Sequence, residues 1–598
     1  MANFAAPVRD IQFTLEHICD FSELAQLEAY QDATPDLVAA LLDGGGKLAS
    51  GVLAPLNRTG DQQGSVLENG VVRTPEGFKE AYREFVDGGW NGLAFDPAHG
   101  GQGLPFTLSV SMMEMITAAN MGFALCPMLN LGAMEAMRHH ASDALKAVFL
   151  DKMVSGEWTS TMNLTEPQAG SDVGALRTRA EPRPDGSYLL SGQKIFITWG
   201  DHDMAENIVH LVLARTPDAP PGTKGISLFV VPKFLVNEDG SLSAANDLRC
   251  VSLEHKLGIH ASPTAVMSYG DNGGCVGYVL GEENKGMRCM FTMMNHARIN
   301  VGLQGAAIGE RAFQRALNYA NERRQGRALG SQSPDSSPIV EHADVRRMLM
   351  TMKAYTEATR AIIHRNAMAV DLSLSHPDQK ERNRQAGIAA FLTPISKGWS
   401  TGKGCEVASI GIQVHGGMGF IEETGAAQHY RDIRIAPIYE GTNGIQAQDL
   451  VMRKLNLDGG RPARQIIREI NTFIDGLPRT GELAAFSRPL KDAVIALEQA
   501  TAWLSGKLAE RPRASLAGAT PYLELAGYVI GGYLLSKGAV AARGLMNEAA
   551  RDRDFYKAKI SVARFFVEQL LPRANSLVAA VTGGDDILFA LTPEQLSA

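Results

Sequence analysis

The order of hydrophobic patterns along the 598 residues limits the fold more than any other feature of the chain. Residues from about 35 to 158 and from 286 to 456 place apolar side chains at helical spacing, and the last section is helical again. Between them, short runs rich in β-branched and aromatic residues are bounded by Gly, Pro, Asp and Asn. These runs predict strands of an antiparallel barrel or sandwich. Helices and strands are segregated, so the sequence predicts a mostly helical α+β fold and no doubly wound sheet.

The same changes of pattern predict five segments. They are an N-terminal extension that packs on the main body (1–34), a helical domain (35–158), a β-barrel domain (159–285), a helical bundle (286–456) and an additional helical domain (465–598). The glycines of "GGGKLA" (44–49) resemble a dinucleotide fingerprint, but they do not follow a strand. We therefore expect no such site there.

Composition argues against several functional classes. The net charge of −8 disfavours binding to nucleic acid or to an anionic membrane. None of the six cysteines forms a C-x-x-C pair, so we expect reduced thiols and no metal site. The N-terminus lacks the pattern of a secretory signal, and no uninterrupted apolar run approaches the length of a membrane span. The C-terminal "QLSA" is not a peroxisomal signal. These features predict a cytoplasmic protein.

One carboxylate stands alone at the end of an apolar stretch. Glu440 follows "IRIAPIY" and precedes a Gly-Thr-Asn-Gly turn. A solvated or helix-capping glutamate is the ordinary interpretation. The apolar run instead favours desolvation, which would raise the pKa of the carboxyl group and make it usable as a general base.

Four further segments suggest contacts with a ring system or a phosphate. Phe196 and Thr198 of "QKIFITWG" share one face of a predicted strand. The others are "LTEPQAGSD" (164–172), three arginines in "ANERRQGR" (320–327) and the glycine turn "QVHGGMG" (413–419). Each also has an ordinary explanation: a core strand, a polar loop, a solvated helix end and a helix closed by glycine.

Together, the motifs resemble the acyl-CoA dehydrogenase family. The set includes "GWNGLAFDPAHGGQGLP", "LTEPQAGSD", "GQKIFIT", "KLGIHASPT", "QVHGGMG" and "RDIRIAPIYEGTNGIQ", and it covers about residues 80–455. The extension and the added C-terminal domain are similar to those of a large subgroup. That subgroup includes the 3-methylmercaptopropionyl-CoA dehydrogenases of bacterial dimethylsulfoniopropionate degradation.

The resemblance implies FAD as cofactor, lying between the β-barrel and the helical bundle, and Glu440 as the catalytic base. In some members the base lies at the position of Ala297, which cannot accept a proton. The implied FAD contacts are Leu164, Thr165, Gly170, Ser171, Phe196, Thr198, Arg323, Gln413, Gly416, Gly417 and Thr442. The implied substrate contacts are Ser171, Asn295, Arg298 and Gly441. Gly326-Arg327 replaces the usual Phe-Gly, which leaves open whether Arg323 or Arg324 contacts the diphosphate.

The resemblance further implies α,β-dehydrogenation of an acyl-CoA to the 2-enoyl-CoA, with 3-(methylthio)propanoyl-CoA among the candidate substrates. An electron-transfer flavoprotein is the implied electron acceptor. Gln413 and the two glycines would reach the FAD of a neighbouring subunit, which implies a homo-oligomer, and we expect a dimer. Alternatives are a medium- or long-chain fatty acyl-CoA dehydrogenase, an acyl-CoA oxidase and a DNA-associated alkylation-response protein. Residues 461–598 hold 17 Lys and Arg against 14 Asp and Glu, too slight an excess for a DNA-binding face.

Overall fold

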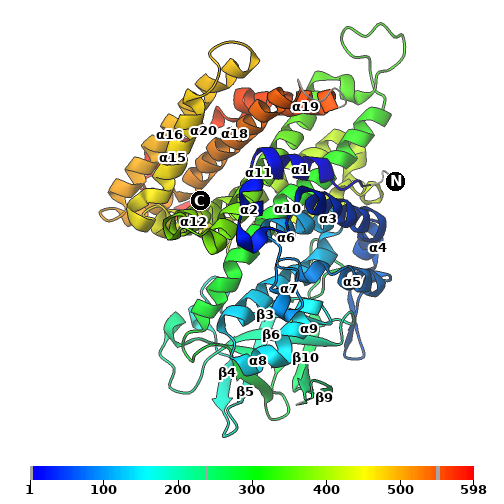
Figure 1. The fold of residues 1–598 in the computed structure, drawn as a ribbon, viewed down its shortest axis with the longest axis vertical. Coiled ribbons are helices and arrows are strands. Elements are labelled where there is room, and N and C mark those ends of the chain that lie inside the picture. Colours follow the sequence, from blue (N-terminus) through cyan, green and yellow to red (C-terminus); the bar gives the residue numbers. More distant parts are fainter. Residues whose placement is uncertain (1–3, 238, 547–551) are drawn as a thin grey trace. The chain divides into compact units, whose positions relative to one another are not determined.

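The computed structural model describes residues 4–237, 239–546 and 552–598 (Figure 1). The chain forms two compact units. The middle unit comprises Gly44–Ala297, and the helical unit comprises Met1–Asp43 together with Arg298–Ala598. Two helices, α3 (Pro35–Leu48) and α10 (Gly286–Glu322), cross the boundaries in the sequence. The division into five domains remains a prediction.

A sheet of eight strands forms the core of the middle unit. Its order is β10-β11-β5-β12-β7-β6-β3, with β4 paired to β5. The strands are β3 (Trp158–Asn163), β4 (Arg179–Pro182), β5 (Tyr188–Thr198), β6 (Asn207–Ala214), β7 (Ser227–Pro232), β10 (Leu248–Leu253), β11 (Thr264–Tyr269) and β12 (Cys275–Val279). Two small hairpins are β1 (Val66–Glu68) with β2 (Val71–Arg73), and β8 (Phe234–Val236) with β9 (Leu242–Ala245).

The predicted antiparallel arrangement holds for these strand pairs except one. β3 and β6 are parallel, with Trp158 opposite Asn207. Parallel neighbours need a long connection, and here the segment that contains β4 and β5 supplies it. The turn "PDGS" (184–187) joins β4 to β5, and Gly186 in this turn has a φ of +83°.

Two helices of the middle unit, α6 (Phe106–Ala119) and α7 (Met121–His140), are buried on nearly all sides. The sequence from Leu108 to Ala141 has apolar residues at every spacing, which predicts one buried helical run; in the structure the run is divided between α6 and α7. Asn120 separates the two helices and caps α7, because its side chain accepts a hydrogen bond from the Phe123 N–H at 3.1 Å. The remaining helices are α4 (Pro55–Gln63), α5 (Phe78–Asp87), α8 (Asp143–Leu145) and α9 (Asp151–Ser155).

The glycines of "GGGKLA" lie in or beside α3 and not in a strand-to-helix turn. A Cβ at Gly45 would lie 2.5 Å from the Met112 sulfur atom, so this glycine permits close packing on α6. The expectation that these glycines do not follow a strand is confirmed.

Long helices build the helical unit. They are α11 (Ala343–Ser375), α12 (Gln379–His415), α15 (Arg461–Asp475), α16 (Ser487–Lys507), α18 (Ala519–Leu545) and α19 (Arg553–Phe565). Shorter helices are α1 (Val8–His17), α2 (Ser22–Ala25), α13 (Ala426–Ile433), α14 (Asn443–Asp449), α17 (Pro512–Ala517) and α20 (Arg573–Thr582). α18 is buried over most of its length and packs against α11, α12, α16, α19 and α20 (Figure 1).

The N-terminal helix belongs to the helical unit. Asp10 of α1 forms an ion pair with Lys559 of α19, and Lys537 of α18 donates to the Ile18 carbonyl oxygen at 2.8 Å. α1 and the residue after it therefore pack against α18 and α19.

One helix in the described part, Ala519–Leu545, is long and apolar enough to cross a membrane, although 83% of its most apolar window is buried within the protein. Such burial is typical of a core helix. Among the described residues, no group of three or more His, Cys, Asp and Glu side chains could hold a metal ion.

Candidate active site

Glu440 lies in the turn between α13 and α14 of the helical unit. Its φ is +55°, and that of Gly441 is +78°, so two successive residues are left-handed. This conformation is costly for a residue with a Cβ and persists only where the surroundings hold it. Gln446 of α14 contributes to holding it, because its side-chain amide donates to the Glu440 carbonyl oxygen at 3.0 Å.

The charges around Glu440 oppose the effect of its burial. Desolvation raises the pKa of Glu440, as predicted, while Arg298 and Lys397 act to lower it. Arg298 is buried and pairs with Asp449 of α14 at 3.5 Å. The raised pKa makes the carboxylate a stronger base, and the two cations still stabilise its charged form.

The apolar run before Glu440 does not form a uniformly dry wall. Ala436 is buried, but the side chain of Ile438 is 49% exposed, because the segment is a series of turns with no periodic inner face. Helix capping, the ordinary alternative for Glu440, is the role of Thr442 instead. The Thr442 hydroxyl accepts a hydrogen bond from the Ile445 N–H at 3.2 Å at the start of α14.

The glycine turn follows the end of α12. Gln413 is exposed in the last turn of this helix, and the Gly416 N–H donates to the Gln413 carbonyl oxygen. Gly416 has a φ of +59°, and a Cβ on either Gly416 or Gly417 would meet no atom within 4 Å. The ordinary expectation of a glycine-closed helix is therefore correct, and the turn also offers open backbone that a ligand could approach.

The arginines at 323 and 324 follow the end of α10. Both are exposed, and the Arg324 Nε donates to the Ser336 carbonyl oxygen at 2.8 Å. This bond ties Arg324 to the loop that precedes α11. The side chain of Asn295 lies outside the described part of the structure.

In the middle unit, a buried ion pair anchors the predicted cofactor loop. Lys194 of β5 donates to the Glu166 carboxylate at 2.8 Å and to the Leu164 carbonyl oxygen at 3.1 Å. Glu166 also accepts from the Thr178 hydroxyl at 2.6 Å. These bonds fix the first half of the loop, with Leu164 and Thr165 half-buried, while Gly170 and Ser171 are exposed.

Phe196 lies beside this loop in a bulge of β5. Lys194 is opposite Met267 and Ile197 is opposite Ala265, so β5 holds one extra residue. Phe196 has a φ of +58°, and 58% of its surface is exposed. The Ile195 N–H donates to the Thr165 carbonyl oxygen at 2.9 Å, which joins the loop to the bulge. An exposed aromatic ring beside an open, hydroxyl-bearing loop fits the edge of a planar ring system.

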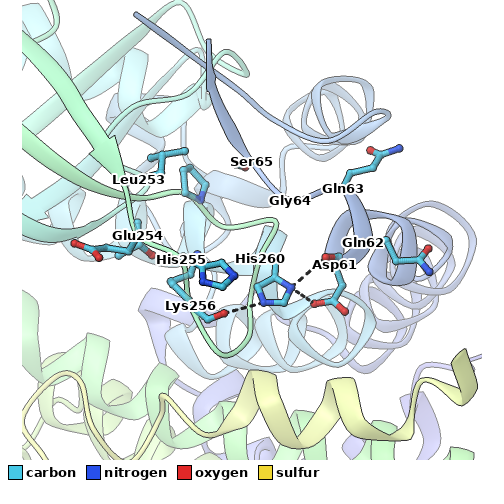
Figure 2. Close-up of a pocket in the computed structure, with 12 residues that line it drawn as sticks. Asp61, Gln62, Gln63, Gly64, Ser65, Leu253, Glu254, His255, Lys256 and His260 are labelled. Atoms are coloured by element: carbon cyan, nitrogen blue, oxygen red, sulfur yellow. Dashed lines mark hydrogen bonds and ion pairs between the residues drawn. The ribbon is translucent and has the colours of Figure 1, made fainter. Parts of the chain in front are cut away.

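A cavity of about 260 Å³ lies at the other strand of this pair, β11. Figure 2 shows His260 directed toward Asp61, and the His260 Nδ1 lies 2.8 Å from an Asp61 oxygen. Lys256, which also lines the cavity, donates to the Ser262 carbonyl oxygen. The polar groups of "KLGIHASPT" bind one another here, which indicates that this motif shapes the loop before β11.

Four residues were missed by the sequence analysis, namely Glu166 and Lys194 of the middle unit, and Lys397 and Gln446 of the helical unit. Glu166 and Lys194 lie inside quoted motifs, and a charged residue within a strand pattern is a signal for a buried pair. Gln446 is the last residue of the quoted motif "RDIRIAPIYEGTNGIQ", but it is uncharged and gave no such signal, and Lys397 lies in none of the quoted motifs.

Family models match four successive parts of the chain. They are described as acyl-CoA dehydrogenase N-terminal domain (67–157), middle domain (161–271) and C-terminal domain (284–455), and as acetyl-CoA dehydrogenase C-terminal like (466–592). The chain belongs to the acyl-CoA dehydrogenase family. It is an FAD-dependent oxidoreductase with the acyl-CoA dehydrogenase fold, as the motifs predicted.

Among relatives of this acyl-CoA dehydrogenase, 3-methylmercaptopropionyl-CoA dehydrogenase of Ruegeria pomeroyi is 47% identical, over 98% of this chain and 99% of the relative. A butyryl-CoA dehydrogenase of Syntrophomonas wolfei is 37% identical, over 98% of this chain and 97% of the relative. The solved structure of an acyl-CoA dehydrogenase complexed with FAD from Bacillus anthracis has a TM-score of 0.73 at 19% identity, covering 96% of this chain and 92% of that one. These relatives match nearly the whole chain, so they share the added C-terminal segment with it.

Proposed function

We propose that this acyl-CoA dehydrogenase acts on a short acyl-CoA, with 3-(methylthio)propanoyl-CoA as the first candidate and 3-(methylthio)acryloyl-CoA as its product. The observation that carries the proposal is the 47% identity, over nearly the whole of both chains, to a relative named for that substrate. Butanoyl-CoA is of similar length and is the second candidate, because a less similar relative is named for it.

Glu440 is the proposed base. Its carboxylate takes the proton from the carbon next to the thioester carbonyl, and the backbone N–H of Glu440 donates to the carbonyl oxygen as negative charge develops there. FAD, when bound, accepts the hydride that leaves the next carbon. Binding of an apolar acyl chain removes water from the carboxylate, which raises its pKa further and improves it as a base near neutral pH.

The residues that we propose to hold FAD are those that the sequence motifs imply. Phe196, Thr198, Leu164, Thr165, Gly170 and Ser171 face the ring system, Thr442 lies near the cofactor, and Gln413, Gly416 and Gly417 contact the cofactor of a neighbouring subunit. Of the two arginines, we assign the diphosphate contact to Arg323, because the Arg324 guanidinium already bonds to the loop before α11. Ser171, Asn295, Arg298 and Gly441 are the proposed substrate contacts.

A homodimer is the proposed assembly, with an electron-transfer flavoprotein as the acceptor and the cytoplasm as the location. Phe420 is 87% exposed just after the glycine turn, and Met418 and Ile421 are exposed beside it. Exposed apolar side chains in a row are typical of a surface that another chain covers. Light scattering with an in-line activity assay tests the assembly. A monomer that carries FAD and is active would contradict the dimer.

The substrate is tested by anaerobic mixing of the FAD-loaded enzyme with a panel of acyl-CoAs, following the loss of flavin absorbance. The panel contains 3-(methylthio)propanoyl-, butanoyl-, octanoyl- and palmitoyl-CoA. We expect the methylthio compound to give the highest ratio of flavin reduction rate to dissociation constant. A higher ratio for palmitoyl-CoA would overturn the short-chain proposal.

The base is tested with Glu440→Gln in the same assay. This variant should retain FAD and bind acyl-CoA, but it should reduce its flavin at least about 1,000-fold more slowly, because the amide accepts no proton. Substantial bleaching by substrate would show that another group is the base.

A further inference from the structure

Lys397 of α12 is completely buried, and its ammonium group binds the turn that carries Glu440. It donates to the Gly441 carbonyl oxygen at 2.7 Å and to the Asn443 side-chain oxygen at 3.0 Å. A buried ammonium group is costly unless its N–H groups find acceptors. Here the acceptors are on the one residue directly after Glu440 and on the residue that begins α14.

Asn443 extends this contact into a clamp. Its side-chain amide donates to the Gly398 carbonyl oxygen at 2.9 Å, and the Thr401 hydroxyl donates to the Asn443 oxygen at 3.1 Å. About one turn of α12, from Lys397 to Thr401, thus binds one side of the Glu440 turn. Gln446 binds the turn from α14 through the Glu440 carbonyl oxygen.

The turn requires such support because Glu440 is left-handed. A residue with a side chain is strained in this region, and loss of its supporting bonds would allow it to relax to the right-handed or extended region. Either change rotates both the carboxylate and the backbone N–H of Glu440 away from a common target. Both groups have roles in the proposed reaction.

We propose that Lys397 is a positioning residue, which aims the carboxylate and the backbone N–H of Glu440 by holding Gly441 and Asn443. The inference rests on the proposed function of Glu440 as the base. Lys397 touches neither substrate nor cofactor in this assignment, and it acts through the turn.

The charge of Lys397 adds a second effect on the same group. Burial lowers the pKa of Lys397 to about 7, Glu440 opposes that decrease, and Arg298 contributes to it. Lys397 in turn lowers the pKa of Glu440. Arg298 of α10 acts on both Lys397 and Glu440, and it pairs with Asp449 of α14, which also binds Arg453. Tyr439, whose pKa is raised by burial and by the charge of Glu440, is a further titratable neighbour. Removal of Lys397 should therefore raise the pKa of Glu440.

The test compares wild type, Lys397→Met and Lys397→Gln as FAD-loaded enzymes. Lys403, also buried on α12, binds Glu524 and Tyr528 instead, so Lys403→Met controls for loss of a buried lysine from this helix. Each variant is assayed for dehydrogenation with 3-(methylthio)propanoyl-CoA and butanoyl-CoA. Proton removal is measured separately, by mass spectrometry in deuterated water, as exchange of the α-protons of a 3-thia-acyl-CoA. Its β-position is sulfur and carries no hydrogen that could leave as hydride.

Lys397→Met should lower both kcat and the exchange rate at least about tenfold, since misplacement of a reacting group by less than 1 Å has effects of this size. Its KM should change by less than threefold, and the acid limb of its kcat/KM profile should move to higher pH. Lys403→Met should retain the kcat and the pH profile of the wild type per bound FAD. Asn443→Ala should slow exchange as well. The double variant Lys397→Met, Asn443→Ala should exchange no more slowly than the slower single variant, because both residues act through the same contact.

Wild-type exchange, kcat and pH profile in Lys397→Met would overturn the inference. If Lys397→Met yields no holoenzyme, the same comparison is made with Lys397→Gln, which keeps a neutral hydrogen-bond donor. The acid limb of its kcat/KM profile should also move to higher pH, and a wild-type profile would overturn the inference. Glu440→Gln is measured in parallel. If it retains exchange and dehydrogenation, the proposed function fails; if it loses both while the Lys397 variants behave as wild type, only the role of Lys397 fails.

Discussion

Lys559 of α19 lies 3.1 Å from Glu357 of α11, and both side chains are almost completely buried. Lys559 also pairs with Asp10 of α1, and Glu357 receives a second cation, Lys353, at 2.9 Å. Three helices from distant parts of the sequence therefore share one buried group of alternating charges. Each charge there depends on its partners, since an unpaired buried charge is strongly destabilising.

Lys559→Met should lower the free energy of unfolding by about 3–5 kcal/mol, because it leaves Asp10 and Glu357 without their shared cation. Urea unfolding followed by circular dichroism measures the effect. Lys557 is exposed on the same helix, so Lys557→Met should remain within about 0.5 kcal/mol of wild type. Equal stabilities of the two variants would contradict the role assigned to the buried group.

Gly527 should be required where α18 crosses Trp399. A Cβ at Gly527 would lie 2.2 Å from the Trp399 ring, whereas a Cβ at Gly544 of the same helix would meet no atom within 4 Å. Gly527→Ala should destabilise the protein by about 1–3 kcal/mol through overpacking. Gly544→Ala should stabilise it by up to about 1 kcal/mol through helix propensity. Thermal unfolding of the two alanine variants checks both signs.

Glu166→Gln should weaken FAD retention without touching a proposed FAD contact. It removes the anion that pairs with the buried Lys194, so the loop that holds Leu164 and Thr165 loses its anchor. We expect a lower ratio of flavin to protein after gel filtration. Glu181 is exposed on β4, and Glu181→Gln is the matched control. An unchanged flavin ratio in Glu166→Gln would show that the loop does not need this pair.

Acid should destabilise the wild type more than it destabilises Glu166→Gln. Burial opposes ionisation of Glu166, but Lys194 and hydrogen bonds from Thr178 and Arg177 hold its pKa at about 2. A lowered folded-state pKa gives stability that is complete above the unfolded value, near 4.5, and lost as pH falls toward 2. The stability of the wild type should therefore fall over this window with a steeper slope than that of the variant. Parallel slopes in urea titrations at pH 5, 4 and 3 would contradict the low pKa.

The fold class and the segregation of helices from strands could be predicted, because each depends on local periodicity. The break at Asn120 was missed, although an Asn before an apolar helix is a capping signal, because the apolar run continues on both sides. The bulge at Phe196 could not be read from the alternation of β5. It appears only when the strand is paired with β11.

For the site, the apolar run before Glu440 predicted the direction of its pKa change, and the role of Glu440 as the base stays a prediction. The sequence did not show which residues support the turn that carries Glu440. Lys397 lies 43 positions before Glu440 in a helix whose apolar pattern hides it, and only the fold brings its ammonium group to the turn. The expectation of a dry apolar run was wrong at Ile438, because a turn does not bury alternate residues as a strand does.

The ion pair between Asp10 and Lys559 joins residues that are 549 positions apart. A ribosome that adds about 5–20 residues per second makes the second partner roughly half a minute to two minutes after the first. During synthesis, the middle unit has all of its residues long before the helical unit does, because Gly44–Ala297 is continuous. The side of α1 that contacts α19 through Asp10 and Phe13 stays exposed until α19 has been made, and a nascent chain stalled before α19 would be a natural target for chaperones.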